Sequence, residues 1–230
     1  MEKLYFSGRY RFLAGFVGLG LLFWSLTPDI ISRLEAADLT VEQFEAAPPE
    51  GASESVVAAL DKNGFRVLKG GEVMGEFWLR PELPLQEPAS TELGVGFGQL
   101  QEGTLIGLVH YPLEWSDYKD NRVAAGVYTL RYGIQPSDGN HLGVSLYRDF
   151  LLLTPAGSDT DPNQTYSHDD LADRSSEASE GQHPAALSLF PVYDEISEPK
   201  LMRNEMDQWM VAKKIGTLIL GLVISGHGEI

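Results

Sequence analysis

The chain contains no cysteine, and this absence excludes several chemistries at once. Without thiols it forms no disulfide, attaches no haem through a Cys-x-x-Cys-His run, binds no Cys-ligated iron–sulfur cluster and has no thiol nucleophile. We therefore expect no cofactor, although calcium stays open as a candidate metal.

Short catalytic signatures are also missing from the sequence. It has no Gly-x-Ser-x-Gly, Ser-x-x-Lys, His-Glu-x-x-His or P-loop pattern. Residues 94–98 spell Gly-x-Gly-x-Gly, but no strand-to-helix context surrounds them, so we interpret them as a flexible loop rather than a dinucleotide site. These absences favour a protein that is not an enzyme, while a hydrolase with a dispersed site remains an alternative.

Basic residues are scarce compared with acidic ones. The chain has 17 Lys and Arg against 33 Asp and Glu, for a formal net charge of −16. A chain of this charge repels phosphate backbones, so nucleic acid is not an expected partner. The same charge favours a basic partner protein or divalent cations.

Three of the basic residues stand together at the start, directly before an apolar run. Lys3, Arg9 and Arg11 precede residues 12–26. A basic head before an apolar core is typical of a segment that enters a membrane while its N-terminus stays in the cytoplasm. We expect one membrane helix that contains Phe12, Gly15, Phe16, Gly18, Leu19, Gly20, Leu22, Phe23 and Trp24. Its glycines either let another helix approach closely or are ordinary membrane-helix composition.

The segment is intermediate in length between a signal peptide and a permanent anchor. A signal core has about 7–15 apolar residues and a spanning helix about 20. The available cleavage sites are poor, because residues 34–36 and 35–37 place a large or charged residue at −3 and Pro28 follows residues 25–27. The sequence favours an uncleaved anchor, and a cleaved signal stays open. We accordingly expect a protein of the bacterial inner membrane, with its N-terminus cytoplasmic and most of the chain periplasmic.

The remainder divides into a linker and a β-domain. After the anchor (residues 1–37), residues 38–54 are acidic and rich in Pro, Gly and Ala, which predicts a linker. In the domain from residue 55 to 230, residues 72–80 alternate apolar and polar side chains with the period of a half-buried strand. Residues 64–69, which are followed by Gly70 and Gly71, are its expected hairpin partner.

Further apolar or β-branched runs predict more strands. They lie at residues 104–111, 127–134, 149–154, 185–192, 208–213 and 218–225, and a helix is expected at 168–180 with a shorter one around Val56. We interpret residues 218–225 as a buried strand because they are too few to span a membrane. Together the runs predict an all-β fold, an antiparallel sandwich or jelly-roll-like domain with one or two short helices.

Several stretches resemble a family of uncharacterised secreted bacterial proteins. They are residues 125–144, 147–153, 183–189 and 222–229, and the likeness covers residues 64–229. The resemblance implies a β-sandwich-like exported domain, but the family has no established activity and supplies no catalytic residues. The N-terminus departs from the family's ordinary cleavable signal.

The densest group of polar residues is a candidate interaction or ligand patch. It consists of Asp138, His141, Tyr147, Arg148 and Asp149. Asp138 followed by glycine is also a hairpin turn, and Arg148 beside Asp149 at a strand start also fits a structural ion pair or loop clamp.

A second acidic stretch is similar to a calcium loop. Its oxygen-bearing candidates are Asp159, Asp161, Asn163 and Asp170. It lacks the glycine and the glutamate of an EF-hand, so a surface loop that caps the following helix is the alternative. Of the five histidines, no two are spaced as metal ligands along one helix or strand, although they can converge in three dimensions.

These observations predict a non-catalytic, membrane-anchored periplasmic interaction protein. We expect it to contact the lipid bilayer through its helix and to serve as an accessory subunit beside integral membrane proteins, for example in a respiratory or photosynthetic electron-transfer complex. A secreted or periplasmic binding module for a small ligand or calcium is the first alternative.

Overall fold

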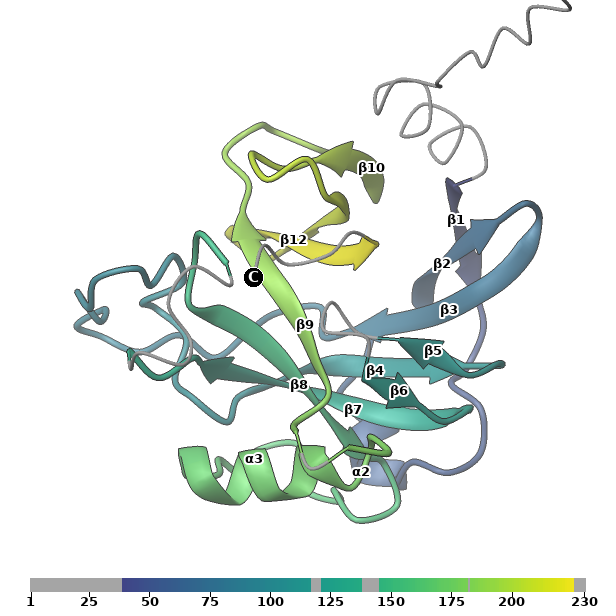
Figure 1. Ribbon diagram of the computed structural model, residues 1–230, viewed down its shortest axis with the longest axis horizontal. Coiled ribbons are helices and arrows are strands. Elements are labelled where there is room, and N and C mark those ends of the chain that lie inside the picture. Colours follow the sequence, from purple (N-terminus) through teal and green to yellow (C-terminus); the bar gives the residue numbers. More distant parts are fainter. Residues whose placement is uncertain (1–38, 117–120, 138–144, 182, 226–230) are drawn as a thin grey trace, which may run out of the picture. The chain divides into compact units, whose positions relative to one another are not determined.

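Antiparallel strands make up most of the folded chain (Figure 1). The computed structural model describes residues 39–116, 121–137, 145–181 and 183–225. Within them, ten strands form one sheet in the order β1-β2-β3-β4-β7-β8-β9-β12-β11-β10. Their bounds are β1 Leu39–Glu45, β2 Asn63–Lys69, β3 Glu72–Leu79, β4 Leu105–Tyr111, β7 Gly126–Ile134, β8 Asp149–Pro155, β9 Ala186–Pro191, β10 Lys200–Arg203, β11 Trp209–Ile215 and β12 Leu218–Ser225.

Smaller elements complete this part of the chain. A two-stranded ribbon pairs β5 (Trp115–Ser116) with β6 (Arg122–Val123). The helices of the described residues are α2 (Glu54–Ala58) and α3 (His168–Ser176). Both are short, and a serine caps each N-terminus: Ser53 accepts a hydrogen bond from Val56 N, and Ser167 accepts one from Asp170 N.

The sheet curls until its first and last strands, β1 and β10, come into contact, so it is barrel-like and nearly closed. Bulges between Val67 and Leu68, between Leu105 and Gly107, and between Trp209 and Met210 bend and twist the paired strands. The predicted antiparallel all-β fold with short helices is confirmed. Two packed sheets are not observed in the described residues, because the pairing runs from one strand to the next without a break and the bulges bend the sheet onto itself.

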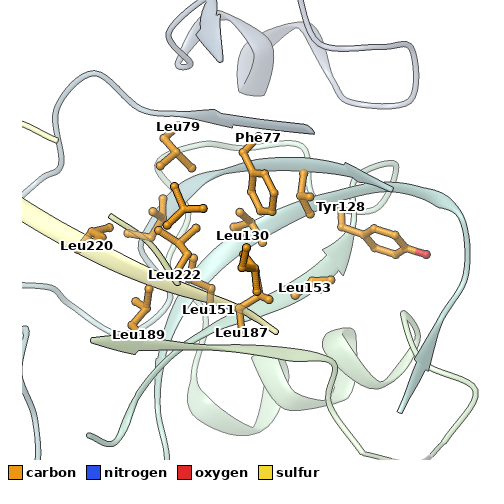
Figure 2. Close-up of a cluster of buried hydrophobic side chains, with 14 of the residues drawn as sticks. Phe77, Leu79, Tyr128, Leu130, Leu151, Leu153, Leu187, Leu189, Leu220 and Leu222 are labelled. Carbon is orange, nitrogen blue, oxygen red and sulfur yellow. The ribbon is translucent and has the colours of Figure 1, made fainter. Parts of the chain in front are cut away.

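One face of the sheet lies inside and forms the main core (Figure 2). Figure 2 shows side chains directed toward one another; its labelled members, from β3, β7, β8, β9 and β12, are Phe77, Leu79, Tyr128, Leu130, Leu151, Leu153, Leu187, Leu189, Leu220 and Leu222. The strand predicted at residues 218–225 is confirmed as β12, with Leu220 and Leu222 fully buried. Burial of such side chains is the main source of the domain's stability.

The predicted hairpin at residues 64–80 is confirmed as β2 and β3. Gly70 and Gly71 connect the strands, and both have positive φ angles, of 60° and 85°. A two-residue turn of this kind matches the strand twist and requires residues that tolerate positive φ.

Two regions of the outer face are covered by helices (Figure 1). Val56 and Leu60, from α2 and the turn after it, pack with Trp78, Leu105 and Leu108. Leu171 of α3 packs with a second outer cluster made of Phe150, Leu152 and Ala186. Strands β3, β4 and β8 are therefore buried on both sides.

The prediction of a linker at residues 38–54 is wrong for its first part, because residues 39–45 form strand β1. Residues 39–45 pair with β2 in antiparallel register, from Leu39 opposite Lys69 to Glu45 opposite Asn63. Leu39 reaches the main core, and the Phe44 ring packs edge-on against Trp78 at 5.2 Å between centroids. The acidic residues between these apolar positions face solvent on an edge strand, so the composition of the segment suggested a linker.

The predicted membrane segment lies outside the described residues, and so does the N-terminus that carries it. Among the residues that the structure describes, no helix is long and apolar enough to span a membrane.

We expect strand β1 to contribute measurably to stability. A chain that starts at residue 47 exposes the edge of β2 and loses the burial of Leu39, which costs at least about 2 kcal/mol. Urea unfolding of this chain beside one that starts at residue 37 measures the difference. Equal unfolding free energies would show that residues 39–45 behave as a linker.

Candidate functional site

The predicted polar patch is only partly described by the structure. Asp138 and His141 lie outside the described residues. Tyr147, Arg148 and Asp149 lie at the start of β8, next to the loop formed by residues 92–97. We call residues 92–97 the apical loop.

Asp149 fastens the apical loop to the sheet through its carboxylate. Its side chain is fully buried, and its two carboxylate oxygens accept hydrogen bonds from Gly96 N at 2.7 Å and Phe97 N at 3.0 Å. The hydroxyl of Tyr132, which points inward from β7, donates a third hydrogen bond at 2.6 Å. One carboxylate thus links the loop to the core of the sheet.

Burial dominates the electrostatics of this pair. Desolvation raises the pKa of Asp149 above the usual value of an aspartate, although the hydrogen bonds from Gly96, Tyr132 and Phe97 act in the opposite direction. Desolvation and the neighbouring Asp149 carboxylate both raise the pKa of Tyr132. Tyr132 therefore keeps its proton and remains the donor.

Arg148 holds the same loop through a second set of hydrogen bonds, to residues 92–94. Its backbone N donates to Gly94 O at 2.8 Å, and its guanidinium donates to Glu92 Oε2 at 3.1 Å and Leu93 O at 3.3 Å. Its Nε also donates to Gln135 O at 2.7 Å. This is the geometry of the loop clamp that the sequence left as an alternative, and a ligand-binding role for these residues stays a prediction. Residues 94–98, expected to be a flexible loop, are tied down at several points.

Apolar side chains are exposed around the clamped loop. The exposed fraction is 93% for Leu93, 55% for Leu146 and 85% for Tyr193. Tyr193 is hydrogen-bonded to Tyr147, whose ring packs edge-on against buried Phe190 at 5.4 Å. Burial, followed by the nearby Tyr193 and Glu205, raises the pKa of Tyr147. We call the surface formed by Leu93, Leu146, Tyr147 and Tyr193 the apical surface.

Acidic residues border the apical surface. Glu92 pairs with Arg148, and Glu205 lies close enough to Tyr147 to affect its pKa. Asp194 and Glu195 follow Tyr193 directly in the chain and are exposed. The surface thus combines an apolar centre with a rim of four acidic residues, two of which are paired with cations, Glu92 with Arg148 and Glu195 with Lys214.

The acidic loop that is similar to a calcium site has a different set of partners. Asp159 is fully buried and forms a bidentate ion pair with the equally buried Arg131, at 2.6 Å from Nε and 2.7 Å from the second terminal nitrogen. The Asp159 carboxylate also accepts hydrogen bonds from Thr129 at 2.6 Å and Tyr166 at 3.1 Å. Both of its oxygens are therefore occupied by protein donors.

Arg131 orders the rest of that loop through backbone oxygens. It donates to Gly103 O at 2.7 Å, to Asp161 O at 2.7 Å and to Gln164 O. Its guanidinium also lies over the Tyr166 ring, 4.7 Å from the centroid. The arginine thus uses its planar, multidentate geometry to hold the segment between β8 and α3.

The remaining calcium candidates do not gather around Asp159. The side chain of Asp161 accepts a hydrogen bond from Asn163 N at 2.9 Å, and Asp170 accepts one from the hydroxyl of Ser167, the cap of α3, at 2.7 Å. Within the described ranges, no group of three or more His, Asp or Glu side chains is placed to hold a metal ion. A calcium site therefore stays a prediction with no support from this geometry.

Two of the three described histidines, His110 and His168, pair with carboxylates. His110 Nδ1 lies 3.0 Å from Glu76 Oε2, and His168 Nδ1 lies 2.9 Å from Glu102 Oε1. His183 is exposed just before β9. His141 and His227 lie outside the described residues.

Sequence reasoning missed Tyr132, Arg131 and Glu102. For Arg131 a signal was present: a charged residue on the same side as Thr129, within an otherwise apolar strand, needs a buried partner. Its partner, 28 residues away in the chain, carried no local signal.

Compared with family models, with curated proteins and with solved structures, the chain matches none of them. The resemblance to a family of secreted bacterial proteins therefore stays a prediction, and function is argued from geometry alone.

The buried ion pair makes a prediction about stability. Arg131→Met leaves Asp159 buried without its counter-charge, so we expect a loss of about 3–5 kcal/mol of unfolding free energy in urea denaturation. The matched control is Arg66→Met, since Arg66 forms a 2.9 Å ion pair with Glu42 at the surface and should cost at most about 1 kcal/mol. Equal effects of the two variants would contradict the role assigned to Arg131.

Proposed function

We propose that this chain is a non-catalytic interaction protein whose apical surface binds a partner protein. The observation that carries the proposal is Leu93, 93% exposed on a loop that Arg148 and Asp149 hold in place. Isolated exposed leucines are ordinary, but here Leu146 precedes Tyr147, which contacts Tyr193, and Arg148 holds the backbone of Leu93.

The fixed shape of the loop supports a role in binding. A loop held by backbone and side-chain hydrogen bonds loses little conformational entropy when a partner binds it. Tyrosine is enriched at the energetic centres of interfaces, and Tyr147 and Tyr193 are joined here by a hydrogen bond. These features favour a preformed interface over a surface that orders only on binding.

Charge indicates the kind of partner. The acidic rim and the net charge of −16 favour a partner with an apolar recess for Leu93 and basic residues around it. A second copy of this chain is disfavoured, because the same acidic rims would face each other.

The apolar segment at residues 12–26 supports a location at a membrane. We propose that it anchors the domain in the bacterial inner membrane with the domain on the periplasmic side, and that the partner is an integral membrane subunit. The protein would then serve as an accessory subunit of a larger assembly, with respiratory and photosynthetic complexes as hosts to test.

The experiment compares two variants of the full chain in its native membranes. Leu93→Asp combined with Tyr193→Asp places charge at the centre of the apical surface and should reduce the fraction that co-migrates with a membrane complex in mild detergent about tenfold or more. Leu113→Asp is the matched control, since Leu113 is 51% exposed and lies away from the apical loop in the chain.

The control should retain the complex, and both variants should unfold at the wild-type temperature. A wild-type chain that migrates as a monomer would overturn the proposal. So would a complex that the double variant retains as well as the control does.

A further inference from the structure

A pocket lies outside the core, between α3 and the outer face of β7, β8 and β9. Its volume is about 290 Å³. Most of its lining is apolar, and the side chains concerned are Ile134, Pro136, Phe150, Leu152, Ala172 and Pro184. Among the described residues that line it, the polar side chains are Gln135, His168 and His183.

The volume suits a small aromatic or branched molecule. An apolar cavity of about 150 Å³ holds benzene, and pockets for small ligands begin at about 300 Å³. The pocket at 290 Å³ is thus large enough for one substituted ring. An apolar lining with a few fixed polar groups is typical of a ligand site.

His168 is the polar group with a fixed orientation. Its Nδ1 lies 2.9 Å from Glu102 Oε1, and that oxygen also accepts a hydrogen bond from Ile134 N at 3.0 Å. An ionised carboxylate only accepts hydrogen bonds, so Nδ1 carries the proton. In the neutral ring, Nε2 is then an acceptor, and none of the described residues donates a hydrogen bond to it.

We propose that this pocket binds a small neutral molecule with an apolar ring and one hydroxyl group, a phenol or a similar alcohol. The ring packs against Phe150, Leu152 and Ala172, and the hydroxyl donates a hydrogen bond to His168 Nε2. Glu102 accepts from Nδ1, so the neutral form of the His168 ring presents Nε2 as the acceptor. Its nearby charge and the net charge of −16 disfavour an anionic ligand.

This inference is independent of the apical surface and of the proposed partner. It rests on the apolar lining and on the His168–Glu102 pair. Loss of partner binding in the variants of Leu93 and Tyr193 would leave it untouched.

The test uses 4-ethylphenol and ethylbenzene, which differ by the hydroxyl alone. Both are titrated into the full chain labelled at alanine methyl groups, and the NMR shift of the Ala172 methyl reports binding. His168→Phe keeps an aromatic ring but removes the acceptor. It should therefore weaken the binding of 4-ethylphenol about tenfold and leave the affinity for ethylbenzene unchanged. Each probe is compared between the variant and the wild type in the same detergent, so the share of the probe that dissolves in the detergent is equal in both titrations.

Two further variants complete the design. Ala172→Phe fills the pocket and should abolish the response of the His168 ring to both probes. Asp173→Ala, at an exposed position of the same helix, should bind both probes as the wild type does. Wild-type protein that gives no saturable shift with 4-ethylphenol would overturn the proposal, and so would equal affinity of His168→Phe and wild type for that probe.

Discussion

Side chains that alternate along β7 hold both the apical loop and the segment between β8 and α3 in place. Tyr132 points into the core and hydrogen-bonds Asp149, which fastens the apical loop. Its neighbour Arg131 points outward and binds Asp159, which fastens the segment leading to α3. Because the period of a strand is two, consecutive residues serve opposite faces of the sheet. A one-residue shift of β7 in the sheet would exchange the two side chains and release both loops.

This arrangement depends on the curling of the sheet. Since β1 approaches β10, the inner face is enclosed by its own strands and the apolar residues on it need no second layer. The outer face is then available for α2, for α3 and for the segments that Arg131 holds. Gln135 lines the pocket beneath α3 and also accepts a hydrogen bond from Nε of Arg148, which holds the apical loop.

The local parts of this fold were predictable from sequence, and the non-local parts were not. Alternation and paired glycines predicted β2 and β3, and apolar runs predicted β4, β7, β8, β9, β11 and β12. The edge strands β1 and β10 were missed, because an edge strand with one solvent-facing side has few apolar residues. Near closure of the sheet depends on bulges and on the contact of β1 with β10, neither of which has a local sequence signal.

In the candidate site, too, the local features were predictable from sequence and the non-local ones were not. The sequence singled out a polar group that includes Tyr147, Arg148 and Asp149. In the structure Arg148 and Asp149 have the geometry of a loop clamp, which was the alternative interpretation. Their partners were hidden, because Glu92 and Gly96 lie more than fifty residues away in sequence. The acidic loop suggested calcium because carboxylates at alternate positions suit a cation. Arg131, from a distant strand, is the cation that Asp159 binds in the structure.

We conclude that the apical loop is a rigid platform for exposed apolar side chains. Amide hydrogen exchange at Gly96 and Phe97 tests it most directly, because both amides donate to the buried Asp149 carboxylate. The account predicts that these two amides exchange as slowly as amides in the core strands β7 and β8. Exchange at the rate of an open chain would contradict it, since the loop would then be fixed only on binding.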